Sequence, residues 1–215
     1  YEYDIKREKS RETLLAVGNG YFGNREAMEE VRADENHYPG TYIAGLYNRL
    51  ESPVGDRMIE NEDFVNTPNW TLIEFKIDHG DWWDYKTANF EIYKKHLCLK
   101  TGLFTKELVV KAPDGKRFKI ESKRMASMAK MHAGAQQYTF TPLNFDGKIT
   151  FRIGIDGKIE NRGVNRYNSL NQNHLEFVSA NATDEKLLVN VKTRQSNITV
   201  SQAVKHSAYV IGQDC

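Results

Sequence analysis

The chain has 215 residues, of which 40% are hydrophobic and 27% charged, a balance typical of globular proteins with room for one large β domain. Its 30 basic and 29 acidic side chains leave a net charge of +1 and are scattered along the sequence, which disfavours a nucleic-acid partner. No apolar run approaches the roughly 18 residues of a membrane span, so we expect no membrane partner either.

The first feature in chain order is Gly18-x-Gly20-x-x-Gly23, the glycine spacing of a dinucleotide-binding loop. Leu14 to Val17 fits the preceding strand, but such a loop also needs a packed helix after its last glycine and an acidic residue about 20 positions later. The next segment, Asn24 to Ala33, contains helix formers but little apolar face. It predicts at most a short helix, and a dinucleotide site is disfavoured.

Alternation of apolar and polar residues predicts strands from residue 70 onward, most clearly over Ile149–Ile155. Turn sequences separate the predicted strands: Pro113-Asp114-Gly115 lies between 108–112 and 116–123, Asp146-Gly147 between 137–143 and 148–155, and His79-Gly80-Asp81 between 72–77 and 82–85. Shorter strands are predicted at 187–191 and 198–200. This pattern predicts a mainly β fold, an antiparallel β-sandwich with few short helices, forming a single domain over residues 1–215.

Two segments, 47–69 and 161–172, lack periodicity and predict long loops, which often carry function on a rigid scaffold. The first holds the acidic run Glu60-Asn61-Glu62-Asp63. No neighbouring apolar residues would raise a carboxyl pKa there, so the run predicts solvated carboxylates rather than a catalytic pair. Residues 123–131 favour an extended strand, and their three methionines predict packing inside the protein: Met125, Met128 and Met131.

Aromatic residues beside planar polar groups are the combination that sugar-binding sites use, and two segments have it. They are Trp82-Trp83-Asp84-Tyr85 and Asn66-Thr67-Pro68-Asn69-Trp70. On a strand Trp82 and Trp83 point to opposite faces, so at most one of them would stack outward on a sugar. Core packing is the commoner role for such residues in a sandwich.

The two cysteines, Cys98 and Cys215, are too few for a disulfide framework and favour a reducing compartment, so we expect a cytoplasmic protein. His96 and Cys98 would face the same side of a strand, but two ligands make only half of a metal site. The other histidines are dispersed, and no Gly-x-Ser-x-Gly elbow occurs. We therefore predict no bound metal and no nucleophilic catalytic site.

The segment Glu12-Thr-Leu-Leu-Ala-Val-Gly-Asn-Gly-Tyr-Phe-Gly-Asn-Arg25 resembles the opening motif of glycoside hydrolase family 65, which holds the maltose, trehalose and kojibiose phosphorylases and the acid trehalases. Further matches follow in the family's order: Gly40–Asn48, Val65–Trp70, Leu97–Glu107, Ser122–Ala129 and Thr141–Phe145. Cys98 stands where the family pattern suggests an acidic residue. The resemblance implies an N-terminal super-sandwich domain, similar to galactose mutarotase, truncated at its C-terminal end.

The resemblance, closest to maltose phosphorylase, implies that the whole protein cleaves an α-linked glucose disaccharide with phosphate as co-substrate and without a cofactor. The general acid and the phosphate-binding residues would lie in a helical (α/α)6 barrel beyond this chain, so no residue here is expected to be catalytic. The implied partners of this domain are its own catalytic domain, a second copy in a homodimer, and the disaccharide through the full-length enzyme.

Two groups of residues are singled out within the resemblance. Residues 47–70 are expected to shape the acceptor-sugar end of the substrate pocket, with these rim candidates: Tyr47, Asn48, Asn66, Asn69 and Trp70. The motif residues are expected either to form tight strand geometry or to pack on the barrel: Gly18, Asn19, Gly20, Tyr21, Gly23, Arg25, Gly40 and Gly45. The alternatives are a hydrolase of the acid trehalase type and a free-standing carbohydrate-binding β-sandwich.

Overall fold

A computed structural model describes residues 3–161, 170–210 and 212, and most of them lie in antiparallel strands. Cys215 and residues 162–169 of the Asn-rich segment lie outside the described residues. The mainly β fold with few short helices is therefore confirmed: the described residues form one α-helix, two 3₁₀ turns and fourteen strands. No helix in the described part of the chain is long and apolar enough to cross a membrane.

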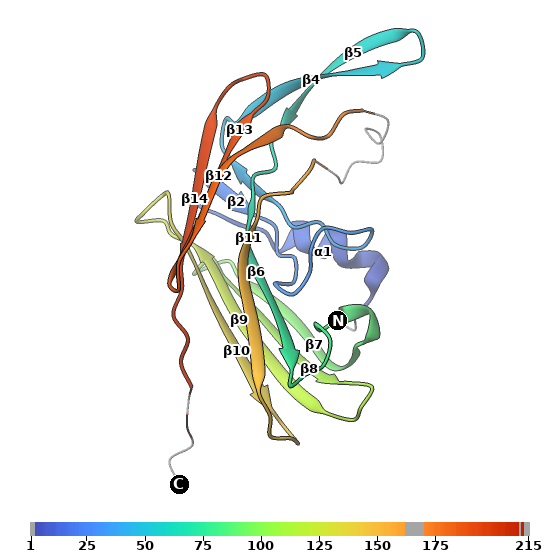
Figure 1. Cartoon of the computed structure of the whole chain (residues 1–215), viewed down its shortest axis with the longest axis vertical. Helices are drawn as coiled ribbons and strands as arrows, with labels where there is room; N and C mark the ends of the chain where they lie inside the picture. The colour runs from blue at the N-terminus through green and yellow to red at the C-terminus, as the bar shows by residue number, and fades with distance from the viewer. Residues whose placement is uncertain (1–2, 162–169, 211, 213–215) are drawn as a thin grey trace.

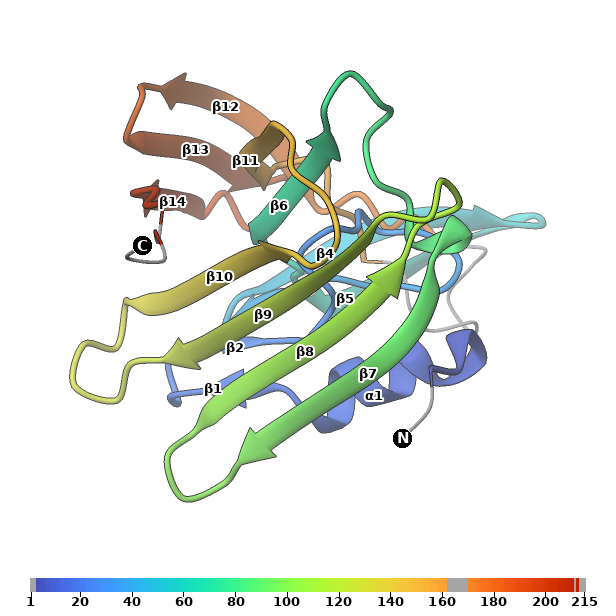
Figure 2. The ribbon, with the colours of Figure 1, turned by 90° about the horizontal axis from the view of Figure 1, so that it is seen from below.

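A four-stranded antiparallel meander forms one layer of the molecule (Figure 2). Its strands, in spatial order, are β10 (Gly134–Pro142), β9 (Arg117–Ala126), β8 (Leu103–Lys111) and β7 (Asn89–Cys98). Every second residue of strand β9 is buried and the residues between them are exposed or partly exposed, as the period-2 pattern predicts. Gly115 has φ +86°, the left-handed conformation that the predicted Pro113-Asp-Gly turn between β8 and β9 requires.

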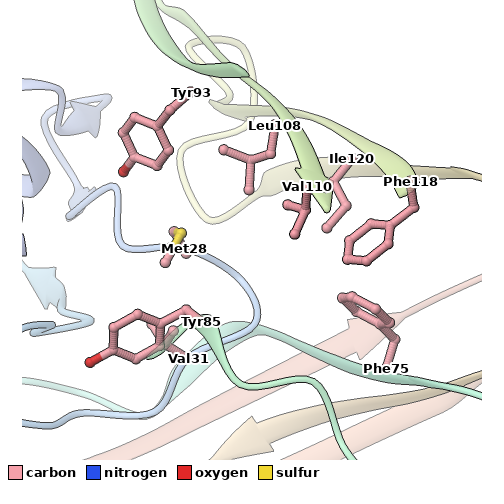
Figure 3. Packing of buried hydrophobic residues seen from close by; sticks show 9 residues of the cluster. All are labelled: Met28, Val31, Phe75, Tyr85, Tyr93, Leu108, Val110, Phe118 and Ile120. Carbon is pink, nitrogen blue, oxygen red and sulfur yellow. The ribbon is translucent and has the colours of Figure 1, made fainter. Parts of the chain in front are cut away.

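Strands β6 (Asn69–Ile77) and β11 (Ile149–Asp156) pair with each other and pack face to face on the meander. Phe75 of β6 meets Phe118 of β9 edge to face, with ring centroids 5.5 Å apart (Figure 3). These rings belong to the larger core cluster, which consists of Met28, Val31, Phe75, Tyr85, Tyr93, Leu108, Val110, Phe118 and Ile120.

The predicted hairpin between residues 137–143 and 148–155 is wrong, because β10 pairs with β9 whereas β11 pairs with β6. Asp78, at the end of β6, accepts a hydrogen bond from Lys148 N and donates its own N–H to Lys148 O. The chain therefore crosses from one layer to the other at Asp146-Gly147. A turn sequence predicts a change of direction but does not specify the partner strand.

The C-terminal strands form a second sheet, which lies toward the upper end of the molecule in Figure 1. They are β12 (Leu175–Ala182), β13 (Lys186–Thr193) and β14 (Thr199–Lys205). One face of this sheet covers a smaller core cluster, which consists of Leu46, Val65, Ile159, Leu175, Val189, Val191 and Val200. The short strand predicted at 187–191 lies within β13, and the one predicted at 198–200 spans the start of β14.

Residues 47–69 do not form the predicted loop. They form a hairpin of β4 (Tyr47–Val54) and β5 (Arg57–Phe64), which projects at the top of Figure 1, followed by the start of β6. Strand β4 does alternate in burial, but two of its three buried side chains, Asn48 and Ser52, are polar. A hydrophobicity pattern therefore cannot detect this strand.

The N-terminal region also differs from expectation. Helix α1 (Glu8–Leu14) replaces the start of the predicted strand at Leu14, and residues 24–33 are coil and turn beyond the end of β2 rather than a helix. The buried residues of α1 are Glu8 and Glu12, a polar stripe with no apolar period. Three short strands follow: β1 (Val17–Gly18), β2 (Phe22–Asn24) and β3 (Thr41–Ile43).

The predicted strand at Trp82–Tyr85 is likewise absent. This segment is irregular and enters the 3₁₀ turn η2 (Tyr85–Thr87), with Trp83 packed on the larger core cluster. The guanidinium carbon of Arg152 lies 4.2 Å from the centroid of the Trp82 ring, so a cation covers one face of that ring.

Candidate functional site

The two ends of the first motif meet in space. Glu12, which is fully buried on α1, places Oε2 3.3 Å from Arg25 Nη2 and Oε1 2.8 Å from His37 Nδ1. Tyr38 N donates to the same carboxylate at 3.0 Å, and Arg25 Nε donates to Tyr38 O at 2.8 Å. These bonds fasten α1 to the loop before β3, so both charged motif residues are engaged inside the domain.

The glycines of the motifs meet local geometric demands. A Cβ on Gly40 would lie 2.7 Å from Arg25 Cδ and 2.8 Å from Tyr42 Cε2, closer than real Cβ atoms approach. Gly20 and Gly45 have φ of +85° and +78°, which side chains rarely tolerate. Gly18 and Gly23 sit opposite each other in the β1–β2 pair. The tight-geometry interpretation therefore has a physical basis at Gly20, Gly40 and Gly45.

Asn19 and Tyr21 fasten the β1–β2 turn to the loop between β9 and β10. Asn19 Nδ2 donates to Ser127 O at 2.7 Å and to Met131 O at 2.9 Å, while its Oδ1 accepts the N–H of Tyr21 at 3.1 Å. The Tyr21 ring stacks on His132 with centroids 4.2 Å apart. Motif residues thus shape a loop that lies more than 100 positions away in the sequence.

The methionines near this loop do not pack inside the protein as predicted. Met128 and Met131 are 81% and 56% exposed, and Met125 is 38% exposed on the outer face of β9. The strand ends at Ala126, so the extended conformation is confirmed for the first part of 123–131 only. A rigidly held loop therefore presents apolar side chains to the surroundings of this domain.

Two of the asparagines expected at a substrate rim are buried and bonded internally. Asn66 Oδ1 accepts Thr41 N at 3.0 Å, and its Nδ2 donates to Pro39 O at 3.1 Å. Asn69 Oδ1 accepts both the N–H and the hydroxyl of Thr71. These side chains hold strands and loops together within the domain.

Asn48 is also buried, and it connects β4 to the turn between β13 and β14. Its Oδ1 accepts Gln195 N at 2.9 Å and Ser196 N at 3.0 Å, and its Nδ2 lies 3.0 Å from His174 Nδ1. Neither Asn48 nor His174 has a polar side-chain atom directed at solvent. Sequence reasoning did not single out His174.

Tyr47 is the rim candidate that the structure leaves most exposed, at 48%. Its ring lies 5.2 Å from that of Phe64 across the hairpin, and Phe64 lies 5.1 Å from Tyr42 with the two rings stacked. The three rings form an aromatic row, of which the sequence indicated one member. Trp70 lies elsewhere, against Gly134, where an added Cβ would come within 3.0 Å of the indole.

A buried charge cluster went unpredicted: Glu26, Glu29, Glu30, Lys106 and Arg124. Arg124 places Nη1 2.8 Å from Glu26 and Nη2 2.8 Å from Glu29, and Lys106 pairs with Glu29 and Glu30. The sequence did hold a signal, because strand alternation puts Lys106 with Leu108 and Arg124 with Ile120 on the inward face.

The pKa values within this cluster diverge. Burial raises the pKa of Glu26 to about 7, with Arg124 opposing and Glu29 adding to the rise. Burial would also raise the pKa of Glu29, but Lys106 and Arg124 together lower it to about 2. Every member is enclosed by the protein, so the cluster serves the fold and offers no acid to a substrate.

A shallow depression of about 240 Å³ lies beside this cluster, lined by residues 30–34, Glu74 and residues 83–86. Arg32 and Arg152 both pair with Glu74, at 3.0 and 2.7 Å, and Tyr85 OH donates to Asp34 at 2.6 Å. Glu74 is therefore paired with two arginines, and Asp34 is hydrogen-bonded to a neighbouring tyrosine. No two of its carboxyl groups are free to flank a glycosidic bond within the described residues.

The acidic run on β5 is likewise partnered. Arg49 pairs with Glu62 at 2.9 Å and with Glu60 at 3.5 Å, and Asp63 contacts His174 at 3.2 Å. His96 and Cys98 share β7, but no group of three or more His, Cys, Asp or Glu side chains is placed to hold a metal ion in the described part of the chain.

Known proteins that are similar in sequence and fold show which family this chain belongs to. An uncharacterized glycosyl hydrolase of Mycobacterium tuberculosis is 34% identical over 98% of this chain, which spans 16% of that protein. A kojibiose phosphorylase of Halothermothrix orenii is 29% identical over 87% of the chain, and a trehalose 6-phosphate phosphorylase of Lactococcus lactis 30% over 93%, with 22% and 25% of those proteins covered.

A solved structure from the human microbiome, proposed to be a kojibiose phosphorylase, has the same fold over 99% of this chain and 28% of its own, with a TM-score of 0.77 at 20% identity. The family description "Glycosyl hydrolase family 65, N-terminal domain" matches residues 1–214. The chain therefore spans about a quarter or less of the curated relatives compared here, and it belongs to glycosyl hydrolase family 65, as an N-terminal β-sandwich domain.

Proposed function

We propose that the protein containing this chain is a phosphorylase that cleaves an α-linked glucose disaccharide, and that this domain is its non-catalytic N-terminal scaffold. Support comes from the family match over residues 1–214 and from relatives named for phosphorolysis of kojibiose and trehalose 6-phosphate. Maltose, kojibiose and trehalose are the candidate substrates, and maltose is the one that the sequence resemblance favours.

In this reaction an oxygen of inorganic phosphate attacks the anomeric carbon while the glycosidic oxygen leaves as the hydroxyl of the acceptor glucose. A carboxylic acid of the catalytic domain supplies the proton to that leaving oxygen. Attack opposite to the leaving group inverts the α-linkage and gives β-glucose 1-phosphate and glucose. Neither a metal nor an organic cofactor is needed, and phosphate is a substrate.

The observation that carries the scaffold role is the internal use of the motif residues. Glu12, Arg25 and Asn19 form hydrogen bonds and ion pairs within this domain, which favours a structural role. The exposed apolar surfaces of the described residues include the methionine-bearing loop 127–133 and the aromatic row of Tyr42, Phe64 and Tyr47. We assign the loop to contact with the catalytic domain and the aromatic row to the rim of the acceptor-sugar site. We assign the whole protein to the cytoplasm, as a homodimer.

The test is an assay of the complete protein with maltose, kojibiose and trehalose, each with and without inorganic phosphate. The proposal expects glucose 1-phosphate only when phosphate is present, with the 215-residue chain inactive in a parallel reaction. Activity of the 215-residue chain alone would contradict the scaffold role.

The word hydrolase in the name of the Mycobacterium tuberculosis relative favours a second candidate, a hydrolase that uses water. Equal glucose release with and without phosphate would support it over the phosphorylase. A third candidate, a free-standing carbohydrate-binding sandwich, predicts saturable quenching of tryptophan fluorescence when the 215-residue chain alone is titrated with maltose.

A further inference from the structure

His174 lies where three elements meet and is almost completely buried, with 1% of its side chain exposed. It immediately precedes β12, and its ring reaches both strands of the β4–β5 hairpin. Nδ1 lies 3.0 Å from Asn48 Nδ2 on β4, and Nε2 lies 3.2 Å from Asp63 Oδ2 on β5. The histidine therefore has one partner on each ring nitrogen.

The hydrogen bonds of Asn48 determine the protonation state that this ring must have. Oδ1 of Asn48 accepts Gln195 N, Ser196 N and the Ser196 hydroxyl, so the amide cannot be rotated by 180° without losing these bonds. Nδ2 then faces His174 and also donates to Arg49 O at 3.1 Å. An amide NH₂ group only donates. Nδ1 of His174 must therefore be an acceptor, and the single proton sits on Nε2, which donates to Asp63.

A second proton on His174 would place an N–H on Nδ1 opposite the N–H of Asn48. We propose that Asn48 and His174 form a proton-sensitive latch between the β4–β5 hairpin and the β13–β14 turn, which opens when Nδ1 of His174 is protonated. Rotating the Asn48 amide would satisfy the new proton, but it would turn Nδ2 toward the N–H groups of Gln195 and Ser196. Protonation therefore either forces Asn48 away from the ring or rotates its amide, and the rotation breaks the connection between β4 and this turn.

Two opposing effects, the charge of Asp63 and burial, act on the protonation of His174. Among the described residues, Asp63 on β5 is the charged group that faces the ring, and its negative charge favours protonation. Strand β4 contributes the neutral Asn48. From the turn, Arg194 donates its N–H to His174 O, while its guanidinium donates to Asn173 O. Burial outweighs Asp63 and lowers the pKa of His174.

Because the pKa of His174 is lowered in the closed latch, the open state binds the proton more readily. The latch is stable above the ordinary histidine pKa of about 6.5 and weakens as the pH falls below that value. If the closed state stays neutral, opening at pH 5.0 is favoured by up to about 30-fold over pH 7.5, which is the ratio of protonation in the open state.

Hydrogen–deuterium exchange of the full-length protein at pH 7.5 and 5.0, corrected for intrinsic rates, tests the latch. Peptides covering 194–198 should show an increase in corrected exchange of several-fold to about 30-fold at the lower pH. Peptides from β8 and β9 are the internal reference, because general unfolding would raise their exchange too. Equal corrected exchange at both pH values, or an equal increase in the reference peptides, would overturn the proposal.

Two variants separate the latch from other pH effects. His174→Gln keeps an acceptor toward Asn48 and a donor toward Asp63 but does not titrate, so the pH dependence at 194–198 should disappear. His132→Gln removes an exposed histidine stacked on Tyr21 and should leave that dependence intact. Persistence of the dependence in His174→Gln, or its loss in His132→Gln, would refute the role of His174.

Discussion

Glu26 and Glu29 are three residues apart, both fully buried, and differ in how completely their charge is compensated. Glu29 contacts both Lys106 and Arg124, whereas Glu26 contacts Arg124 alone among the charged members of the cluster. Because two cations compensate the burial of Glu29 and one does not suffice for Glu26, the first stays ionised and the second titrates near neutral pH.

Glu26→Gln should change how stability depends on pH. The folded protein binds a proton at Glu26 more tightly than the unfolded chain, so this group lowers the free energy of unfolding as the pH rises from 4.5 to about 7. The variant has no carboxyl to titrate at this position, so its free energy of unfolding should rise relative to that of the parent chain by roughly 3 kcal/mol between pH 4.5 and about 7. Urea denaturation at pH 4.5, 5.5, 6.5 and 7.5 measures the difference.

Glu121→Gln is the matched control, because it removes one carboxyl from the exposed face of the same strand that carries Arg124. A pH-dependent gain of similar size in Glu121→Gln would assign the effect to net charge. A constant difference between Glu26→Gln and the parent chain would show that Glu26 does not titrate in this range.

At the scale of elements, the β1–β2 turn anchors the β9–β10 loop through hydrogen bonds. Asn19→Ala removes two side-chain hydrogen bonds to that loop and two accepted from the turn itself. These bonds are part-buried or exposed, so each contributes at the lower end of the usual net value, about 0.5 kcal/mol, and stability should fall by about 2 kcal/mol. Exchange of the amides in residues 127–133 should rise at the same time, since the loop loses its attachment. Urea denaturation and hydrogen exchange measure the two effects.

Tyr21→Phe is the matched control for Asn19→Ala. It keeps the ring that stacks on His132 and removes only the hydroxyl, so both stability and exchange of the loop should match the parent chain. If Asn19→Ala left exchange at 127–133 unchanged, the loop would be held by its own turn rather than by the motif.

At the scale of the whole molecule, strand β11 links the two core clusters. Its first residue, Ile149, packs against the larger cluster, and Ile155, near its end, packs against the smaller one. Gln202 of β14 also donates to Thr67, beside the start of β6. Because both cores share one continuous strand, we expect the two clusters to unfold together as a single cooperative unit.

Substitutions in each cluster test this cooperativity. Phe118→Ala should cost about 3–5 kcal/mol and Val191→Ala about 2 kcal/mol, because both side chains are buried. Both should shift the same urea transition, followed by tryptophan fluorescence and by far-ultraviolet circular dichroism. Val210→Ala, at a fully exposed position, is the control and should change nothing. Two transitions, each sensitive to one variant, would show two folding units.

The sequence alone predicted β9, whose burial alternates, and the turn at Gly115, because a buried face and a left-handed φ each restrict which residues can occupy them. It also predicted β11 as a strand, but burial does not alternate there and Phe151 is exposed. It missed α1 and the β4–β5 hairpin, since Glu8, Glu12, Asn48 and Ser52 are buried through hydrogen bonds and ion pairs, which leave no apolar period.

The partners of the polar side chains depend on the tertiary fold. Asn48, Asn66 and Asn69 read as ligand-facing residues in sequence, but residues up to 148 positions away satisfy Asn48 in the fold. The pairing of β11 with β6 and the position of His174 were also undetermined. The reason is physical: a hydrogen bond between distant residues depends on how layers pack, and local sequence patterns contain no information about that contact.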